Sequence, residues 1–367
     1  MAESPSLGVT FRPQSPPEDL RAAVQTADRA GIAELWLWED CFSEGGLTTA
    51  AAALSCSSRI KVGVGLLPVP LRNPALAAME IATLARLWPG RFLPGLGHGV
   101  QDWMKQIGAG VPSPMTLLRE YTKAVRDLLH GGTVTMDGRY VQLEQVKLDW
   151  PPAEVPPVLV GGRGPRTLRL AGELADGVIL DRVEVAGDVR TARELLAEGR
   201  AAAGRDGATH VTIFTELDVA AQPVGTRRDR MLERAAALGE AGADSVVFHG
   251  TGAQPDPGPY IEALAEEHPL TGAAHPVGYC PVTPDGGGPR PLQRYPAGHD
   301  AGACRRAAAE PERTGRDGAD REAPHLVDGD GGGHAGPGQH LDRALAGRHQ
   351  LAEQRVLADF ELDGQVR

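Results

Sequence analysis

The fold is decided by residues 59–99, which read RIKVGVGLLPVPLRNPALAAMEIATLARLWPGRFLPGLGHG. The first part, residues 59–67, is rich in β-branched residues and ends in alternating glycines, a pattern that favours a strand buried on both faces. The proline-rich run that follows cannot continue a strand. Asn73 before Pro74 is then a typical start of a helix, because asparagine caps well and the proline has no N–H to leave unpaired.

The helix is expected over residues 75–88 and ends at Pro89-Gly90, after which residues 91–97 form a second buried strand. Its apolar side is expected to carry Leu76, Ala77, Ile81, Leu84 and Trp88. Two strands joined by a crossover helix make a parallel unit. Both strands end in glycine-rich loops, and parallel barrels keep their active sites at those strand ends.

The alternation of strand and helix continues on both sides of this unit. Further strands are expected at residues 7–11, 34–39, 158–161, 177–181, 211–217 and 245–249. Further helices are expected at residues 16–30, 46–56, 113–129, 165–175, 189–204, 227–241 and 259–267. A hairpin at residues 133–136 and 140–143 is inserted, turning on Asp137-Gly138 as a type I′ turn would. Eight strands and eight helices predict an α/β fold of the (β/α)₈ TIM-barrel class, with a doubly wound sheet as the alternative.

Composition limits the function classes. The chain has 367 residues and a formal charge of −11, from 48 Asp and Glu against 37 Lys and Arg. No basic stripe with interleaved aromatic residues offsets this charge, so nucleic acid is not expected as a partner. The four cysteines show no CxxC pairing, and neither a metal site nor a disulfide framework is expected. No signal pattern and no apolar run of about 18 residues is present, so we expect no membrane span and a soluble, cytoplasmic protein.

The character of the sequence changes near residue 268. All five tryptophans precede Pro151, whereas seven of the eleven histidines fall in the last hundred residues. We therefore expect a barrel domain over residues 1–267 and a low-complexity, largely disordered tail over residues 268–367, with residues 341–362 as its one candidate helix. Its Gly/Pro/Arg/Ala/Asp bias fits either a natural disordered tail or a shifted reading frame of a GC-rich gene.

Two runs resemble a known family: GVGLLPVPLRNPALAAMEIATLARLWPGRFLPGLGHGVQDWM (63–104) and VLVGGRGPRTLRLAGELADGVIL (158–180). They resemble the luciferase-like monooxygenase superfamily, in particular its branch that uses the deazaflavin coenzyme F420 and is related to methylenetetrahydromethanopterin reductase. The resemblance covers about residues 7–267. It implies a (β/α)₈ barrel with a flavin or deazaflavin across its C-terminal mouth.

The resemblance also implies positions for the cofactor. The family holds the back of the ring against a non-prolyl cis peptide, which corresponds here to Gly65–Leu66, with Gly97 ending the next strand. Its phosphate site corresponds to Gly161, Gly162, Arg163, Gly164, Arg166 and Thr167. That loop joins a strand to a helix N-terminus, where free N–H groups and the helix dipole attract anions. A plain turn is the alternative, and Arg182 is the alternative anion-binding residue.

Three residues are candidates for catalysis. Asp40 and Cys41 follow the second strand, where related sugar-phosphate dehydrogenases have an Asp-His pair on the reacting face of the ring. Cys41 replaces that histidine, and Val100 stands where those enzymes have a glutamate, so this chain departs from their pattern. His98 is the candidate proton carrier, although it could also be a hydrogen-bonded residue without a chemical role. Asp102 and Trp103 are expected to line the pocket, with a place in the core as the alternative for Trp103.

The prediction is an oxidoreductase that transfers a hydride between coenzyme F420 and a small organic substrate. The alternatives are an FMN-dependent luciferase-like monooxygenase and a cofactor-binding protein, or damaged gene product, without catalysis. A homodimer is expected by analogy with the family. The substrate does not follow from the fold.

Overall fold

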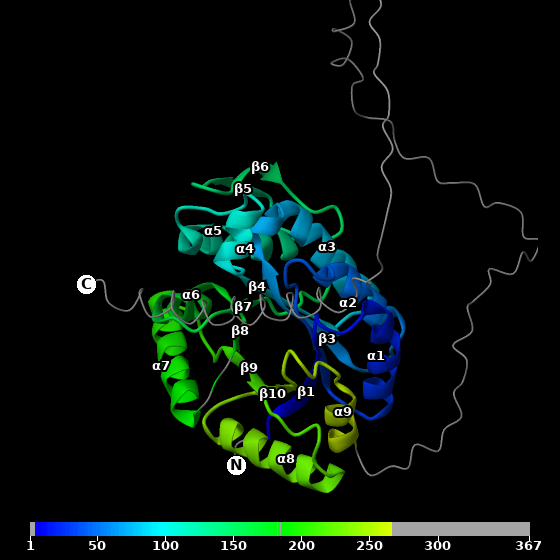
Figure 1. The fold of residues 1–367 in the computed structure, drawn as a ribbon. Helices are drawn as coiled ribbons and strands as arrows, with labels where there is room; N and C mark the ends of the chain where they lie inside the picture. The colour runs from blue at the N-terminus through cyan, green and yellow to red at the C-terminus, as the bar shows by residue number, and fades with distance from the viewer. Residues whose placement is uncertain (1–3, 182, 184, 266–367) are drawn as a thin grey trace, which may run out of the picture. The chain divides into compact units, whose positions relative to one another are not determined.

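Eight parallel strands close into a barrel in the computed structural model of the chain, which describes residues 4–181, 183 and 185–265 (Figure 1). Around the barrel the strands are β1 (Ser6–Phe11), β10 (Ser245–His249), β9 (His210–Glu216), β8 (Gly177–Leu180), β7 (Leu159–Gly161), β4 (Phe92–Gly97), β3 (Lys61–Pro68) and β2 (Glu34–Leu37). Every neighbouring pair is parallel. The (β/α)₈ barrel predicted from the sequence is confirmed, and the tail at residues 268–367 lies outside the described residues.

The helices lie around the outside of the strands (Figure 1). They are α1 (Leu20–Arg29), α2 (Gly46–Ser55), α3 (Pro74–Leu87), α4 (Gln101–Gln106), α5 (Pro114–Leu129), α6 (Pro165–Leu174), α7 (Ala186–Ala202), α8 (Val224–Glu240) and α9 (Gly258–Leu264), with 3-10 turns η1 (Pro17–Asp19) and η2 (Val69–Leu71). The short helix α4 is absent from the sequence-based prediction. It follows β4 and therefore lies at the rim of the barrel, where the strands end.

Helix α3 begins as its sequence predicts. The side chain of Asn73 accepts a hydrogen bond of 2.8 Å from the backbone N–H of Ala75, and Pro74 occupies the first helical position. One expected core residue is wrong, because Leu76 is 46% exposed. It lies with Met79 and Leu87 on the outer face of α3, while the alanines of the opposite face pack on the strands.

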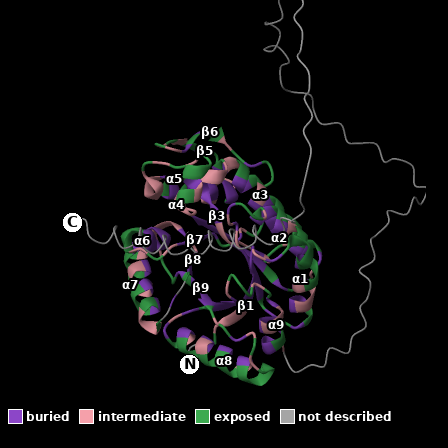
Figure 2. Ribbon diagram, viewed as in Figure 1, coloured by how far each residue is buried: buried purple, intermediate pink, exposed green. Residues whose placement is uncertain are grey.

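The buried residues form two clusters. The larger fills the space between the strands and the helices, and the smaller fills the inside of the barrel with Trp36, Leu159, Ile179, Phe214 and Val247. In Figure 2 buried residues follow the strands and the barrel-facing sides of the helices. Because successive strand residues point to opposite faces, strand positions two residues beyond the inner cluster also point inward. The inner cluster is therefore the floor on which the mouth of the barrel is built.

The inserted hairpin, β5 (Val134–Asp137) with β6 (Gln142–Val146), differs from its prediction in the turn. Asp137 pairs with Gln142, so four residues connect the strands and the two-residue type I′ turn is wrong. The carboxylate of Glu120 on α5 accepts hydrogen bonds of 2.8–3.0 Å from the backbone N–H groups of Arg139, Tyr140 and Val141. This longer loop is thus stabilised by a side chain from another element.

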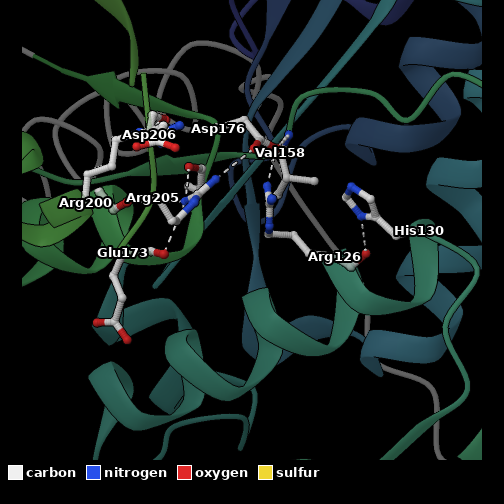
Figure 3. A network of polar contacts seen from close by, with 10 residues as sticks. Arg126, His130, Val158, Glu173, Asp176, Arg200, Arg205 and Asp206 are labelled. Atoms are coloured by element: carbon white, nitrogen blue, oxygen red, sulfur yellow. Dashed lines mark hydrogen bonds and ion pairs between the residues drawn. The ribbon is translucent and has the colours of Figure 1, made fainter. Parts of the chain in front are cut away.

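A polar network ties the helices together at the N-terminal ends of β7 and β8 (Figure 3). Asp176 accepts a 3.1 Å hydrogen bond from the N–H of Val158 and forms ion pairs with Arg126 and Arg205. Arg205 also donates to the carbonyl of Ala175 at 2.7 Å. Since parallel barrels place their sites at the opposite end, this network serves stability.

Two further observations concern the described residues. No helix among them is long and apolar enough to cross a membrane. Cys41 and Cys56 are buried free thiols there, whereas Cys280 and Cys304 lie outside the described part of the chain.

Candidate active site

The C-terminal ends of the eight strands meet at one mouth, because all of them run in the same direction. On one side of this mouth the side chain of Leu66 lies across the ends of β4 and β7. A Cβ atom at Gly97 would come within 2.3 Å of Leu66 Cδ2, and one at Gly161 within 2.5 Å. Only glycine at both positions therefore lets Leu66 lie there, and its apolar side chain is partly exposed.

The Gly65–Leu66 peptide bond is cis, as the resemblance implies. A second non-prolyl cis bond, Cys41–Phe42, follows β2 and is absent from the sequence-based prediction. The first bond lies on β3 and the second in the loop after β2, and β2 and β3 pair in parallel. Both candidate segments therefore belong to the same part of the mouth.

His98 directly follows β4, and its two ring nitrogens differ in their hydrogen bonding. Nδ1 is buried and has no hydrogen-bond partner among the described residues, while the ring also bonds to the backbone of Pro114. We assign that bond to Nε2–H donating to the Pro114 carbonyl, which leaves a lone pair on Nδ1. Burial lowers the pKa of His98 below its usual value near 6.5, and the hydrogen bond to Pro114 acts in the opposite direction. At neutral pH the ring is thus uncharged and able to accept a proton.

Asp40 and Cys41 lie between β2 and α2, and the Cys41 side chain is only 9% exposed. Burial raises the pKa of the Cys41 thiol, and the charges of Asp40 and Glu39 raise it further. The thiol therefore stays protonated near neutral pH and is a poor nucleophile. Glu39 fixes this segment, since its carboxylate pairs with Arg72 at 2.8 Å and accepts from the N–H of Gly46 at 2.7 Å.

The expected phosphate loop joins β7 to α6, and the structure separates its two arginines. Arg163 Nη1 lies 3.4 Å from the carbonyl oxygen of Asp181 at the end of β8, on the side of the mouth. Arg166 instead lines a groove on the outer surface together with residues of α5 and α7. Thr167 is buried, and its hydroxyl contacts the sulfur of Met115 at 3.4 Å. Arg182, the alternative anion-binding residue, lies outside the described residues.

A polar cluster on the other side of the mouth was missed by the sequence analysis. The buried Arg12 lies with Nη1 3.2 Å from His249 Nδ1 and 3.6 Å from Glu216 Oε2, and it donates to the Gly250 carbonyl at 2.5 Å. Its guanidinium also lies over the ring of Trp38, 4.8 Å from the centroid. His249 Nδ1 also lies 2.9 Å from the Gly250 carbonyl oxygen. Arginine only donates and a carbonyl only accepts, so these two neighbours place opposite demands on Nδ1.

The two sides of the mouth therefore differ in chemistry. The strands β3, β4 and β7 contribute glycines and the apolar surface of Leu66. The strands β1, β2, β9 and β10 contribute the polar cluster, with Phe214 stacked on Trp38 at 6.0 Å. A signal for these residues was available, since Trp38, Glu216 and His249 each stand two positions beyond an inward-facing core residue. Using it requires the strand register, which the sequence alone does not supply.

No group of three or more His, Cys, Asp or Glu side chains in the described part of the chain could hold a metal ion. The mouth presents His98, the apolar side chain of Leu66 and the polar cluster around Arg12. These groups can hold a flat ring and move a proton beside it.

Comparison with known proteins identifies the family to which the sequence is similar. The family described as luciferase-like monooxygenase matches residues 5–268. A 5,10-methylenetetrahydromethanopterin reductase of Methanolobus tindarius is 29% identical over 251 residues, which are 68% of this chain and 73% of that protein. An F420-dependent hydroxymycolic acid dehydrogenase of Mycobacterium tuberculosis is 33% identical over 207 residues, 52% of this chain and 56% of that one.

The match to these relatives is partial in length. The chain spans 59% and 64% of two further methylenetetrahydromethanopterin reductases, from Archaeoglobus fulgidus and Methanopyrus kandleri. The solved structure of the coenzyme F420-dependent tetrahydromethanopterin reductase of Methanopyrus kandleri superposes with a TM-score of 0.60 at 22% identity. It covers 72% of this chain and 98% of that one, and at this identity the likeness concerns the fold.

Proposed function

The chain belongs to the luciferase-like monooxygenase family, and from this membership we propose that it is an oxidoreductase that transfers a hydride between coenzyme F420 and a small organic substrate. The F420-dependent dehydrogenase and the reductases among its relatives support this choice of cofactor. When bound, F420 supplies the hydride-transfer chemistry of a deazaflavin.

The residues of the mouth fit such a cofactor. The apolar side chain of Leu66, which lies over Gly97 and Gly161, offers a contact for a deazaflavin ring. We propose Gly65, Leu66 and Gly97 beside the ring, and Gly161, Gly162, Arg163, Gly164 and Thr167 around the phosphate. The first turn of α6 leaves backbone N–H groups without intrahelical partners, which favours an anion there.

We assign the proton to His98. In the oxidation of a hydroxyl-bearing substrate, Nδ1 of His98 accepts the hydroxyl proton while the substrate carbon loses a hydride, so the substrate leaves as a carbonyl compound. The reverse reaction returns that proton from His98 to the carbonyl oxygen. Asp40 and Cys41 border the same space, and Cys41 shapes it as a neutral thiol.

The observation that carries this proposal is the buried Nδ1 of His98, which has no partner among the described residues and directly follows Gly97, the glycine against which Leu66 lies. The test is a fluorescence titration of the purified protein with F420 and, separately, with FMN. We expect F420 to bind more tightly, and Arg163→Glu to weaken that binding by about 1–3 kcal/mol through charge repulsion. Arg29→Glu on α1, which changes the net charge equally, is the control.

The opposite preference would move the protein to the FMN-dependent branch. Deazaflavins do not activate oxygen, so oxygen consumption with reduced FMN would confirm that alternative. Binding of F420 without turnover of any alcohol or carbonyl compound would favour the cofactor-binding protein.

The cytoplasmic location and the homodimer stay predictions, and sedimentation velocity tests the homodimer. For a dimer we propose the outer face of α3, where Leu76, Met79 and Leu87 are 46–63% exposed.

A further inference from the structure

A basic groove runs along the outer surface beside the phosphate loop. It has a volume of about 610 Å³ and lies on α5, α6 and α7. Its lining includes Met115, Arg119, Arg166, Arg169, Glu173 and Glu198. Helices α6 and α7 pack so closely that a Cβ atom at Gly199 would come within 2.0 Å of the Arg169 carbonyl. The groove is therefore held on a rigid pair of helices.

The groove is positive in a protein that is negative as a whole. Arg119 pairs with Glu173, and Arg169 Nε donates to Glu198 at 2.8 Å. Arg166 has no carboxylate partner among the described residues. Three guanidinium groups against two carboxylates leave one positive charge, whereas the full chain carries −11.

The two ion pairs leave some N–H donors of the arginines unused. Each guanidinium has five N–H donors, of which Arg169 uses Nε for Glu198 and Nη1 for the Pro165 carbonyl at 3.5 Å. Both pairs are also exposed, since the side chains of Arg119 and Arg169 are each 48% accessible. Exposed pairs of this kind contribute little stability, so a carboxylate ligand can share or replace them at low cost.

The groove begins where the phosphate loop ends. Arg166 stands in the first turn of α6, so its backbone N–H belongs to the helix N-terminus while its side chain lies in the groove. Met115, at the same end of the groove, contacts the hydroxyl of Thr167. A ligand whose phosphate lies at this helix N-terminus therefore leaves the mouth next to Arg166, with Arg169 one turn further along.

We propose that this groove binds the oligoglutamate chain that F420 carries beyond its phosphate, with Arg166 and Arg169 as the main carboxylate-binding residues. This inference rests on the proposed function, because it concerns the same cofactor. It separates two roles that the sequence assigns to one motif. Arg163 faces the mouth and the phosphate, and Arg166 faces the tail of the ligand.

The experiment compares cofactor forms that differ only in the tail. Dissociation constants are measured by fluorescence at low salt for F420 with several glutamates, for F420 without glutamate, and for the deazaflavin that lacks phosphate and tail. In the unaltered protein we expect the glutamate-bearing form to bind about tenfold more tightly than the form without glutamate. The double variant Arg166→Gln/Arg169→Gln should lose that difference and bind both forms equally.

The control is Arg29→Gln combined with Arg190→Gln, which removes two positive charges from α1 and α7 outside the groove lining and should keep the tenfold preference. Equal binding of both forms by the unaltered protein, or a preference that survives in the double variant, would overturn the inference while the proposed function stands. Failure of every deazaflavin to bind would overturn both. Circular dichroism confirms that each variant is folded.

Discussion

His98 can act on only one of its two nitrogens. With Nε2–H assigned to the Pro114 carbonyl, Nδ1 is the atom left to accept a proton. Since burial lowers the pKa of the ring, the acceptor form is populated throughout the neutral range. Cys41, by contrast, has a raised pKa and carries no charge to contribute.

We therefore predict unequal effects for two substitutions. His98→Ala should lower kcat roughly 10²-fold or more, because the proton acceptor is lost, whereas Cys41→Ser should keep much of the turnover. Stopped-flow reduction of F420 by an alcohol found in a substrate screen measures both rates. In the unaltered protein kcat/KM for oxidation should rise with pH, because His98 must be neutral to accept a proton. Since its pKa is lowered, the plateau should already be reached before the pH rises to about 6.5. An inactive Cys41→Ser beside an active His98→Ala would make the thiol the working group.

Part of the candidate site could be predicted from sequence, and the reason lies in how its residues are spaced. The Gly65–Leu66 bond and the loop at residues 161–167 belong to continuous motifs. Arg12, Trp38, Glu216 and His249 lie on or directly after four different strands, and they meet because β1 pairs with β2 and β10 and because β10 pairs with β9. No local sequence pattern predicts that these four residues lie close together.

At the scale of secondary-structure elements, Asp28 connects α1 to the segment that enters β3. Its carboxylate accepts hydrogen bonds of 2.7–2.9 Å from the N–H groups of Ser58, Arg59 and Ile60. Burial alone would raise the pKa of Asp28, but these bonds outweigh it and lower the pKa below 3.8. An acidic residue in the last turn of a helix is unfavourable for the helix dipole, so its value lies in this connection.

We predict that Asp28→Asn lowers the free energy of unfolding by about 2 kcal/mol at pH 7, because the amide presents a donor where the carboxylate only accepts. The folded-state pKa is lowered, so this stability is fully present above the ordinary pKa of 3.8 and is lost below it, as the pH falls through the lowered folded-state pKa. Urea unfolding at several pH values measures it. Asp127→Asn, at an exposed pair with Lys123 on α5, is the control and should cost less than about 0.5 kcal/mol. Equal losses in the two variants would contradict the prediction.

The elements that the sequence missed or misjudged share a physical cause. The loop after β5 is decided by Glu120, which lies 17 residues before Asp137 on another element, so Asp137-Gly138 could not reveal it. Helix α4 has six residues and no side-chain cap, which leaves too little periodicity to detect. Long elements with caps, such as α3, were predicted within a few residues.

For the whole molecule, the number of strands determined the fold class. Eight buried strands alternating with helices leave a closed barrel as the simplest way to remove both sheet edges, and the pairing of β1 with β10 provides that closure. The last described helix, α9, packs against α1 and α8. Tyr260 and Ile261 are buried, and the Tyr260 hydroxyl donates to the Leu217 carbonyl at 2.6 Å.

Because the barrel is closed by residues before 268, we make a prediction about residues 268–367. The family match ends at residue 268, and the later sequence has no apolar period that could extend the core. A chain truncated after Glu267 should therefore keep its melting temperature within about 2 °C and its affinity for F420. A chain truncated after Pro257 also loses α9 and should be destabilised by about 3 kcal/mol or more, since it exposes the sites of Tyr260 and Ile261. Calorimetry of both proteins measures the difference. If the chain truncated after Glu267 lost more than about 2 kcal/mol in its free energy of unfolding, the last hundred residues would contribute to the stability of the barrel.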